Sequence, residues 1–311
     1  MEIFQLRYFL GVAETQNFTR AAERCHVSQP ALSQQIINLE SEIGHKLFHR
    51  LGRKAVLTEA GITFMERARR ILFEVENAAK ELSDHPSLER RITVGAVQTV
   101  MPYLITPLIA ECRVAFPNLQ IDAREDFRAN LVRAVMEGDL DLAITPLPVQ
   151  DHRVSIEPLL TEPLLLAVGK THRFAKLSEI SITDLAEETF ISLGDSSALA
   201  AQIRTFFGDS KFQPRIGIRC AQVATLKLFA TLGLGISLLP ELARVPDDRD
   251  TLRYLRLTGD QPTRQLGIVR HLQRYQSRGA QQFLGLLREY VSKHHPTPIR
   301  TPKPKRTAHK R

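Results

Sequence analysis

The chain has 311 residues, about twice the length of a typical domain, so two or three domains are expected. Its apolar fraction of 43% and charged fraction of 24% suit a globular protein, and no stretch reaches the roughly 18 apolar residues of a membrane span. Cys25, Cys112 and Cys220 form no C-x-x-C pair, which argues against a disulfide framework or a zinc site and fits a reducing cytosol.

The net charge of +8 is concentrated at the carboxyl end. Seven of the 42 Lys and Arg residues lie in the last 19 residues, which contain no Asp or Glu, so the rest carries a net charge of only +1. Basicity is therefore weak evidence for nucleic-acid binding. Residues 296–311 are predicted to be a disordered basic tail, which either attracts phosphates non-specifically or has no role.

The segment 18–50 predicts two helices joined by a tight turn. Thr19 can cap the first helix. Ser28 can cap the second, and Pro30 falls in its first turn, where the missing N–H has no intrahelical partner. Apolar residues recur along one side of the second helix at the spacing of a buried stripe; they are Leu32, Ile36 and Leu39. The other side of this helix should therefore face outward.

That outer side is predicted to carry amides and a hydroxyl, from Gln29, Ser33 and Gln34, beside Pro30. Amides donate and accept hydrogen bonds at once, which suits base edges in the DNA major groove. The alternative is an ordinary helical hairpin with a polar outer face. A hairpin-like LGRKAVL follows, and Arg50 and Arg53 would place guanidinium groups beside a phosphate backbone.

Five short motifs occur in order within residues 1–61, at spacings that match a known pattern without insertion or deletion. They are F-T-x-A-A at 18–22, V-S-Q-P-A-L-S at 27–33, L-E at 39–40, L-F-x-R at 47–50 and L-T-x-A-G at 57–61. This arrangement resembles the winged helix-turn-helix of LysR-type bacterial transcription regulators. The chain departs from the family at Ile37 and Asn38, where basic residues are frequent. The resemblance implies binding to double-stranded promoter or operator DNA, and the predicted contacts are Thr19, Ser28, Gln29, Pro30, Ser33, Gln34, Arg50 and Arg53.

Residues 58–87 are expected to form a linker helix and a hinge. Thr58 can cap the helix, and Asp84 to Ser87 would break it. Apolar residues repeat at alternating intervals of four and three, the heptad seam of a coiled coil; they are Phe64, Ala68, Ile71, Val75, Ala78 and Leu82. Dimerisation through this stripe is predicted, as the resemblance also implies. The alternative is that the stripe packs on the chain's own amino-terminal domain.

Residues 88–295 alternate strands with helices in two series, which predicts a mostly parallel sheet covered on both faces. Lobe 1 is expected at about 88–161 and 265–295, and lobe 2 at about 162–264. The pair resembles the periplasmic-binding-protein-like effector domain of the same family, which makes the chain a multidomain α/β protein. A small-molecule effector, either an anion or another polar ligand, would bind in the cleft between the lobes.

Two loops of that cleft offer backbone N–H groups and hydroxyls to a small polar ligand. They are Gln98–Thr99 and Ser196–Ser197, and plain N-capping is the alternative for each. The family fold brings both loops to one cleft and adds neighbouring positions. The predicted effector contacts are Gln98, Thr99, Val100, Thr145, Pro146, Ser196, Ser197 and Thr225.

Segments 94–104 and 224–240 are similar to the peroxide-sensing branch of the family. Its reactive and resolving cysteines would fall at Ala198 and near Phe207, so no disulfide switch is predicted. Cys112 and Cys220 are expected to be structural. A thiol-independent oxidative-stress regulator remains an alternative.

An enzyme and a solute-binding protein are the competing classes. The sequence has no G-x-S-x-G elbow, P-loop or complete G-x-G-x-x-G. His45 and His49 have the spacing of a helical metal pair, but Lys46 stands where a zincin has its Glu, so no metal or other cofactor is predicted. The amino terminus lacks the apolar core of a signal peptide. We expect a cytoplasmic, non-enzymatic regulator with no membrane partner, forming a homodimer to homotetramer and contacting RNA polymerase if it is an activator.

Overall fold

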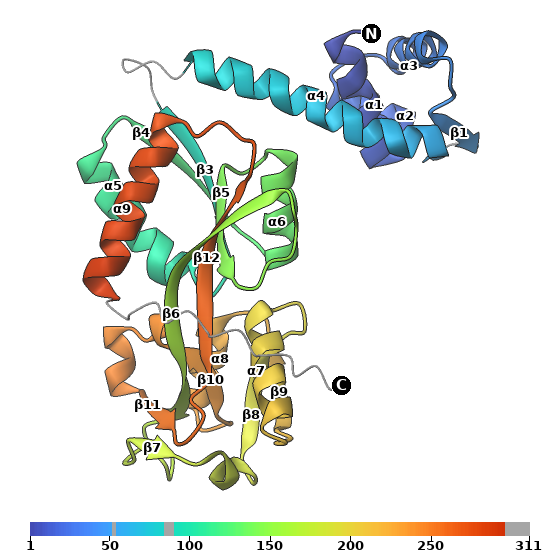
Figure 1. Ribbon diagram of the computed structural model, residues 1–311. Helices are drawn as coiled ribbons and strands as arrows, with labels where there is room; N and C mark the ends of the chain where they lie inside the picture. Colours follow the sequence, from blue (N-terminus) through green and yellow to red (C-terminus); the bar gives the residue numbers. More distant parts are fainter. Residues whose placement is uncertain (52–53, 84–89, 296–311) are drawn as a thin grey trace, which may run out of the picture. The chain divides into compact units, whose positions relative to one another are not determined.

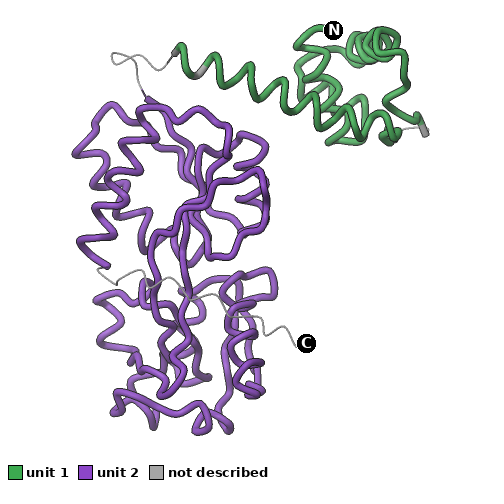
Figure 2. Tube along the Cα trace, in the orientation of Figure 1, with its two compact units in different colours: residues 1–86 green, residues 87–311 purple. Residues whose placement is uncertain are grey.

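The computed structural model describes residues 1–51, 54–83 and 90–295. The chain divides into two compact units, Met1–Pro86 and Ser87–Arg311 (Figures 1 and 2). The predicted hinge at Asp84 to Ser87, the predicted tail at 296–311 and Arg53 lie outside the described residues.

The first unit is a helical domain with a two-stranded hairpin. Its elements are α1 Ile3–Thr15, α2 Phe18–Arg24, α3 Gln29–Ile43, β1 Phe48–Leu51, β2 Lys54–Leu57 and α4 Glu59–Ser83. The predicted inner stripe of α3 is confirmed, because Leu32, Ile36 and Leu39 are each 0% exposed. The hairpin that follows α3 is also present, with β1 antiparallel to β2.

Side-chain caps fix where these helices begin and end. The carboxamide oxygen of Asn17 accepts hydrogen bonds from the backbone N–H groups of Thr19 (2.9 Å) and Arg20 (3.1 Å), so Asn17 caps α2 and the prediction of Thr19 as the cap is wrong. Ser28 caps α3 as predicted, accepting from the N–H of Ala31 at 3.4 Å. Gly44 ends α3 in the left-handed conformation, with φ of +78°, which glycine adopts without strain.

A buried carboxylate joins α3 to the hairpin. Glu40, 5% exposed, accepts hydrogen bonds from the backbone N–H groups of Leu47 (2.8 Å) and Phe48 (3.2 Å). Lys46 places its ammonium 2.9 Å from the same carboxylate. The end of the helix and the start of β1 are therefore held together by one side chain.

The apolar stripe of α4 divides into two parts. Ala68 is 0% exposed and Phe64 packs edge-on against Phe9, with ring centroids 5.0 Å apart, so both belong to the unit's own core. For these two residues the prediction of a stripe without a partner in its own domain is wrong. Later positions lie at the surface, with Ile71 38% and Leu82 87% exposed. Ala78 is also exposed and Val75 is half-buried.

The second unit is an α/β structure of two lobes. Its main elements are β3 Arg90–Ala96, η1 Met101–Ile105, α5 Thr106–Ala115, β4 Leu119–Glu125, α6 Arg128–Glu137, β5 Leu142–Pro146, β6 Val154–Gly169, β7 Glu179–Ile180, η2 Ile182–Leu185, β8 Thr189–Leu193, α7 Ala198–Asp209, β9 Arg215–Cys220, α8 Val223–Thr231, β10 Ser237–Pro240, η3 Glu241–Ala243, η4 Pro246–Asp250, β11 Leu252–Leu257, β12 Thr263–His271 and α9 Arg278–His294. Two separate apolar cores form, one around Ile92 and Phe283 and the other around Phe190 and Leu239.

The larger sheet is mixed rather than mostly parallel. Its strand order is β4-β3-β5-β12-β6-β11-β7, with β10 also paired to β6. β3 pairs in parallel with β4 and β5, whereas β12 and β6 run antiparallel to each other. No α-helix separates β5 from β6 or β10 from β12, so the chain returns without the crossover that parallel pairing requires. The expected parallel sheet is therefore limited to the βαβ segments.

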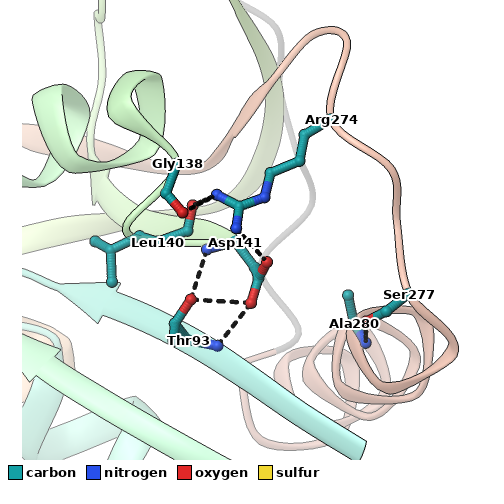
Figure 3. Close-up of polar contacts among 7 residues, drawn as sticks. All are labelled: Thr93, Gly138, Leu140, Asp141, Arg274, Ser277 and Ala280. Atoms are coloured by element: carbon teal, nitrogen blue, oxygen red, sulfur yellow. Dashed lines mark hydrogen bonds and ion pairs between the residues drawn. The ribbon is translucent and has the colours of Figure 1, made fainter. Parts of the chain in front are cut away.

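Two long strands connect the lobes. β6 pairs with β12 along its first half and with β10 and β11 along its second, and Figure 1 shows β6 and β12 passing from one lobe to the other. After β12, Arg274 binds the chain to the rest of lobe 1 (Figure 3). Its guanidinium forms an ion pair with Asp141 at 3.1 Å and donates hydrogen bonds to the carbonyls of Gly138 and Leu140. Asp141 in turn accepts from Thr93 of β3 at 2.8 and 2.9 Å.

Candidate functional site

The outer face of α3 carries most of the predicted base contacts. Gln29, Pro30 and Gln34 are exposed, and Ser28 precedes them at the cap. Ser33 is only 9% exposed, so its prediction as an outward-facing contact is wrong. A residue next to Leu32 and one turn before Ile36 lies at the edge of the buried stripe. Thr19, on α2, is exposed.

Sequence reasoning missed the later part of this face. Ile37, Asn38 and Ser41 are also exposed, in line with Pro30 and Gln34. Nε2 of Gln34 donates to Oδ1 of Asn38 at 3.0 Å, which orients both amides. The departure from the family's basic residues at these positions was the signal available in the sequence.

The hairpin presents an arginine beside α2. The guanidinium of Arg50 lies 4.6 Å from the centroid of the Phe18 ring, a cation–π contact that holds the charge of β1 beside α2. Arg50 is exposed and remains accessible to a phosphate. The histidines flanking this region do not form a helical pair, since His49 lies on β1 and His45 precedes that strand.

In the second unit, three of the predicted effector residues meet in one small hollow. Gln98 and Thr99 follow β3 in lobe 1, while Ser197 caps α7 in lobe 2 by accepting from the N–H of Ala200 at 3.4 Å. Arg128, at the start of α6, lines the same hollow with Asp126. Loops from both lobes therefore converge here.

A broad, open cleft continues from this hollow and shares Arg128 with it. Its volume is about 750 Å³, within the roughly 300–1,000 Å³ of small-molecule sites. One wall is α6, with Arg128 and Val132, and the other is α7, with Gln202 and Phe206. Nε2 of Gln202 donates to the carbonyl of Leu147 at 3.2 Å, which links α7 of lobe 2 to the segment that follows β5 of lobe 1. These positions have no motif, so sequence reasoning missed them.

The other five predicted effector residues line neither the small hollow nor the open cleft. Val100 and Thr145 are 0% exposed, and Pro146 is buried at the end of β5. Ser196 is exposed and Thr225 is half-buried on α8. For Val100, Thr145 and Pro146 the expected contact with an effector does not fit their burial.

Thr99 is engaged in a buried ion-pair network. Its hydroxyl accepts from Nη1 of Arg264 at 2.6 Å, and its carbonyl accepts from Nη2 at 3.2 Å. Nε of Arg264 donates to Glu162 at 2.7 Å, with the two side chains 0% and 5% exposed. Glu162 also accepts from the N–H of Leu242 at 2.6 Å. Thr99 therefore holds Arg264 in place where the two lobes join. No sequence motif indicated that Glu162 or Arg264 belongs to this network.

The cysteines lie in surroundings that disfavour the thiolate. Cys112 is 0% exposed, and burial raises its pKa to about 11. Burial also raises the pKa of Cys25 and of Cys220, both half-buried. Across the described ranges there is no cluster of three or more potential metal ligands. Likewise, none of the helices in those ranges has the length and apolar character needed to cross a bilayer.

Comparison with known proteins accounts for both units. Residues 3–62 match the family described as "Bacterial regulatory helix-turn-helix protein, lysR family", and residues 85–292 match "LysR substrate binding domain". The chain is 35% identical over 273 residues to the DNA-binding transcriptional dual regulator OxyR of Escherichia coli K12, covering 86% of this chain and 89% of that protein.

Solved structures give the same assignment. A full-length OxyR variant from Pseudomonas aeruginosa superposes with a TM-score of 0.71 at 26% identity, covering 94% of this chain and 95% of that one. HinK, a LysR family regulator from the same organism, gives 0.61 at 26% identity, with coverages of 94% and 99%. The chain belongs to the LysR family: it is a DNA-binding transcriptional regulator with an amino-terminal helix-turn-helix domain and a two-lobed effector-binding domain.

Proposed function

We propose that this regulator is controlled by a small anionic molecule that binds in the cleft between α6 and α7. The observation that carries the proposal is that the cleft, of about 750 Å³, has walls from both lobes. A molecule that contacts both walls favours the arrangement of lobes in which both contacts form. Binding would then change how the DNA-reading helices of an oligomer are presented.

One cation and one carboxylate line the cleft: Arg128 begins α6, and Asp209 ends α7, at the opposite end of that helix from Ser197. Arg128 lines both the hollow and the cleft, and among the described residues the one hydrogen bond of its guanidinium is a long one, from Nη1 to the carbonyl of Pro148 at 3.4 Å. The nearby carboxylate of Asp126 is engaged by Arg124 and Asn130, each at 2.7 Å. The guanidinium of Arg128 is thus the group best placed to bind a carboxylate or phosphate.

Thermal unfolding of the full chain against a panel of metabolites tests this proposal. An anionic ligand should raise the wild-type Tm, its neutral amide analogue should not, and Arg128→Ala should abolish the shift. Arg133→Ala is the matched control, because Arg133 is exposed on the same helix and does not line the cleft. A neutral ligand that stabilises the wild type and Arg128→Ala equally would contradict the anionic assignment.

On DNA, Ser28, Gln29, Pro30 and Gln34 are assigned to base edges, with Pro30 against a thymine methyl, and Arg50 to a phosphate. Arg53 keeps its predicted phosphate contact, and Thr19 flanks the site. The chain acts by binding in the cytoplasm, without catalysis. A mobility-shift assay on its own upstream region tests this role, and a protein that bound every duplex equally would contradict it.

Oligomers are assigned to two apolar surfaces. The exposed half of α4, with Ile71, Ala78 and Leu82, supports a homodimer. Exposed leucines at the end of α8, Leu228 at 58% and Leu232 at 64%, support assembly toward a homotetramer. If the regulator activates transcription, RNA polymerase is a further partner.

A thiol switch is excluded from this proposal, although several relatives are named hydrogen peroxide-inducible genes activators. Cys112 is fully buried, and the position that corresponds to the reactive cysteine of the peroxide-sensing branch is Ala198, the first residue of α7. Any oxidative-stress role would be independent of thiols. Mass spectrometry of the peroxide-treated protein should show three unlinked cysteines, and a Cys112–Cys220 disulfide would contradict the proposal.

A further inference from the structure

The outer stripe of α3 combines an exposed isoleucine and a proline with uncharged polar residues. Five exposed residues on successive turns form it: Pro30, Gln34, Ile37, Asn38 and Ser41. Ile37 is 38% exposed at the middle of this stripe. By contrast, the outer face of α4 carries charged side chains such as Glu66, Arg67 and Arg70. The α3 stripe therefore differs in chemistry from an ordinary solvated helix face.

This chemistry matches base edges better than the phosphate backbone. Phosphates attract cations, whereas the major groove offers donors, acceptors and the 5-methyl group of thymine. Amides satisfy the donors and acceptors. A thymine methyl is the apolar feature of the groove, and Ile37 is the apolar side chain at the middle of the α3 stripe, two helical turns after Pro30. We propose that Ile37 determines sequence preference by packing against a thymine methyl group.

A hydrogen bond between the side chains of Gln34 and Asn38 fixes the orientation of the two amides next to Ile37. Because Nε2 of Gln34 donates to Asn38 at 3.0 Å, the two amides are tied to each other one turn apart. The Oε1 acceptor of Gln34 and the Nδ2 donors of Asn38 remain to bind a base. One helical turn rises about 5.4 Å and one base pair about 3.4 Å, so Gln34 and Ile37 reach base pairs one or two steps apart.

The inference rests on the proposed base-reading role of α3, and its test separates the two. Selection of duplexes from a random pool by the full-length protein defines the preferred site. Each thymine of that site is then replaced singly by deoxyuridine, which lacks only the methyl group. In wild type, replacing the thymine that contacts Ile37 should weaken binding about fourfold in each half-site, the factor that burial of one methyl group is worth. A thymine that contacts Pro30 would give a separate loss, which Ile37→Ala should leave unchanged.

Ile37→Ala should bind the unmodified site about fourfold more weakly and show no further loss at that thymine. Ile62→Ala is the matched control, because Ile62 is 55% exposed on α4 and should leave the wild-type pattern of losses unchanged. Alanine favours helix, so Ile37→Ala should fold with an unchanged or slightly higher Tm.

Three results would overturn the inference. The first is an Ile37→Ala protein that keeps the wild-type dependence at every thymine, and the second is a wild type insensitive to all the replacements. The third is a loss of oligomers in Ile37→Ala by sedimentation, which would place Ile37 in a protein interface. A selection that enriches no sequence would instead contradict the base-reading role of α3, and this inference would fall with it.

Discussion

Arg264 and Glu162 form an ion pair of 2.7 Å with both side chains buried, at the point where β12 and β6 leave one lobe for the other. The two residues are 102 positions apart in the chain. Arg264 also donates to Thr99, which follows β3, and Glu162 accepts from Leu242 in η3. Four segments of the effector-binding domain are therefore held by one guanidinium and one carboxylate.

Replacing Glu162 by Gln should destabilise this domain strongly. The change keeps the side-chain shape but leaves the Arg264 charge buried without a countercharge, which costs about 3–5 kcal/mol of unfolding free energy. Urea denaturation measures the loss. The control is Asp122→Asn, which breaks the Arg91–Asp122 pair, whose side chains are 68% and 56% exposed, and should cost less than about 1 kcal/mol. Equal effects of both changes would show that the buried pair has no special weight.

Acid should weaken the domain partly through Asp248. Burial acts to raise the pKa of Asp248, but hydrogen bonds from Lys227 and Tyr254, both 2.7 Å, outweigh it and hold the pKa below the ordinary 3.8. Since the folded pKa lies below the unfolded one, the stabilisation is complete above about pH 4 and disappears as the pH falls through the folded value.

Asp248→Asn should therefore have a lower unfolding free energy than wild type at about pH 6, and the two should converge as the pH falls below about 4. Urea titrations across this range measure the difference. Asp247→Asn is the control, because Asp247 is exposed in the same short helix and should behave as wild type. A constant difference between Asp248→Asn and wild type at all pH values would contradict this linkage.

Leu82→Ser should weaken dimerisation without changing stability. Leu82 is 87% exposed, so it supports no packing within its own unit. Loss of its burial in a dimer would raise the dimer Kd about tenfold or more, measured by sedimentation velocity. Phe64→Ala gives the contrast, since Phe64 packs on Phe9 and its loss should lower the Tm of the DNA-binding unit. An unchanged dimer Kd in Leu82→Ser would remove the end of α4 from the interface.

Gln34→Ala and Arg50→Ala should have different effects on DNA binding, the first on sequence preference and the second on affinity for every duplex. The first should cost about 1–3 kcal/mol on the preferred site and relax base preference, because an amide contact to a base edge is lost. The second should weaken all duplexes alike and reduce the slope of log K against log salt by about 0.9. Fluorescence anisotropy at several salt concentrations measures both. If Arg50→Ala changed the preferred sequence and Gln34→Ala did not, the two roles would be reversed.

The local parts of the fold were predictable because they depend on neighbours in the chain. The spacing of Leu32, Ile36 and Leu39 specifies a buried stripe, and a serine before Gln29 and Pro30 specifies a cap. The cap of α2 was assigned wrongly because Asn17 and Thr19 are both good capping residues. Only the observed start of the helix at Phe18 decides between them.

The remaining features depend on distant parts of the chain. An apolar stripe looks the same whether it meets its own domain or a partner, so Phe64 and Ala68 could not be distinguished from Leu82. A Glu and an Arg within apolar strands gave no clue to their pairing across 102 positions. The walls of the cleft are ordinary residues of two amphipathic helices, and they become a site only where α6 and α7 face each other.

Glu40 has a consequence for the energetics of operator binding. Because its carboxylate accepts hydrogen bonds from the backbone N–H groups of both Leu47 and Phe48, α3 and the β1–β2 hairpin are already aligned in the free protein. The entropy of aligning them is therefore lost during folding rather than on the duplex, and this preorganisation favours tight association. Glu40→Ala removes this acceptor and would return that loss to the binding step, so the affinity for all sequences would fall even where each contacting side chain is intact.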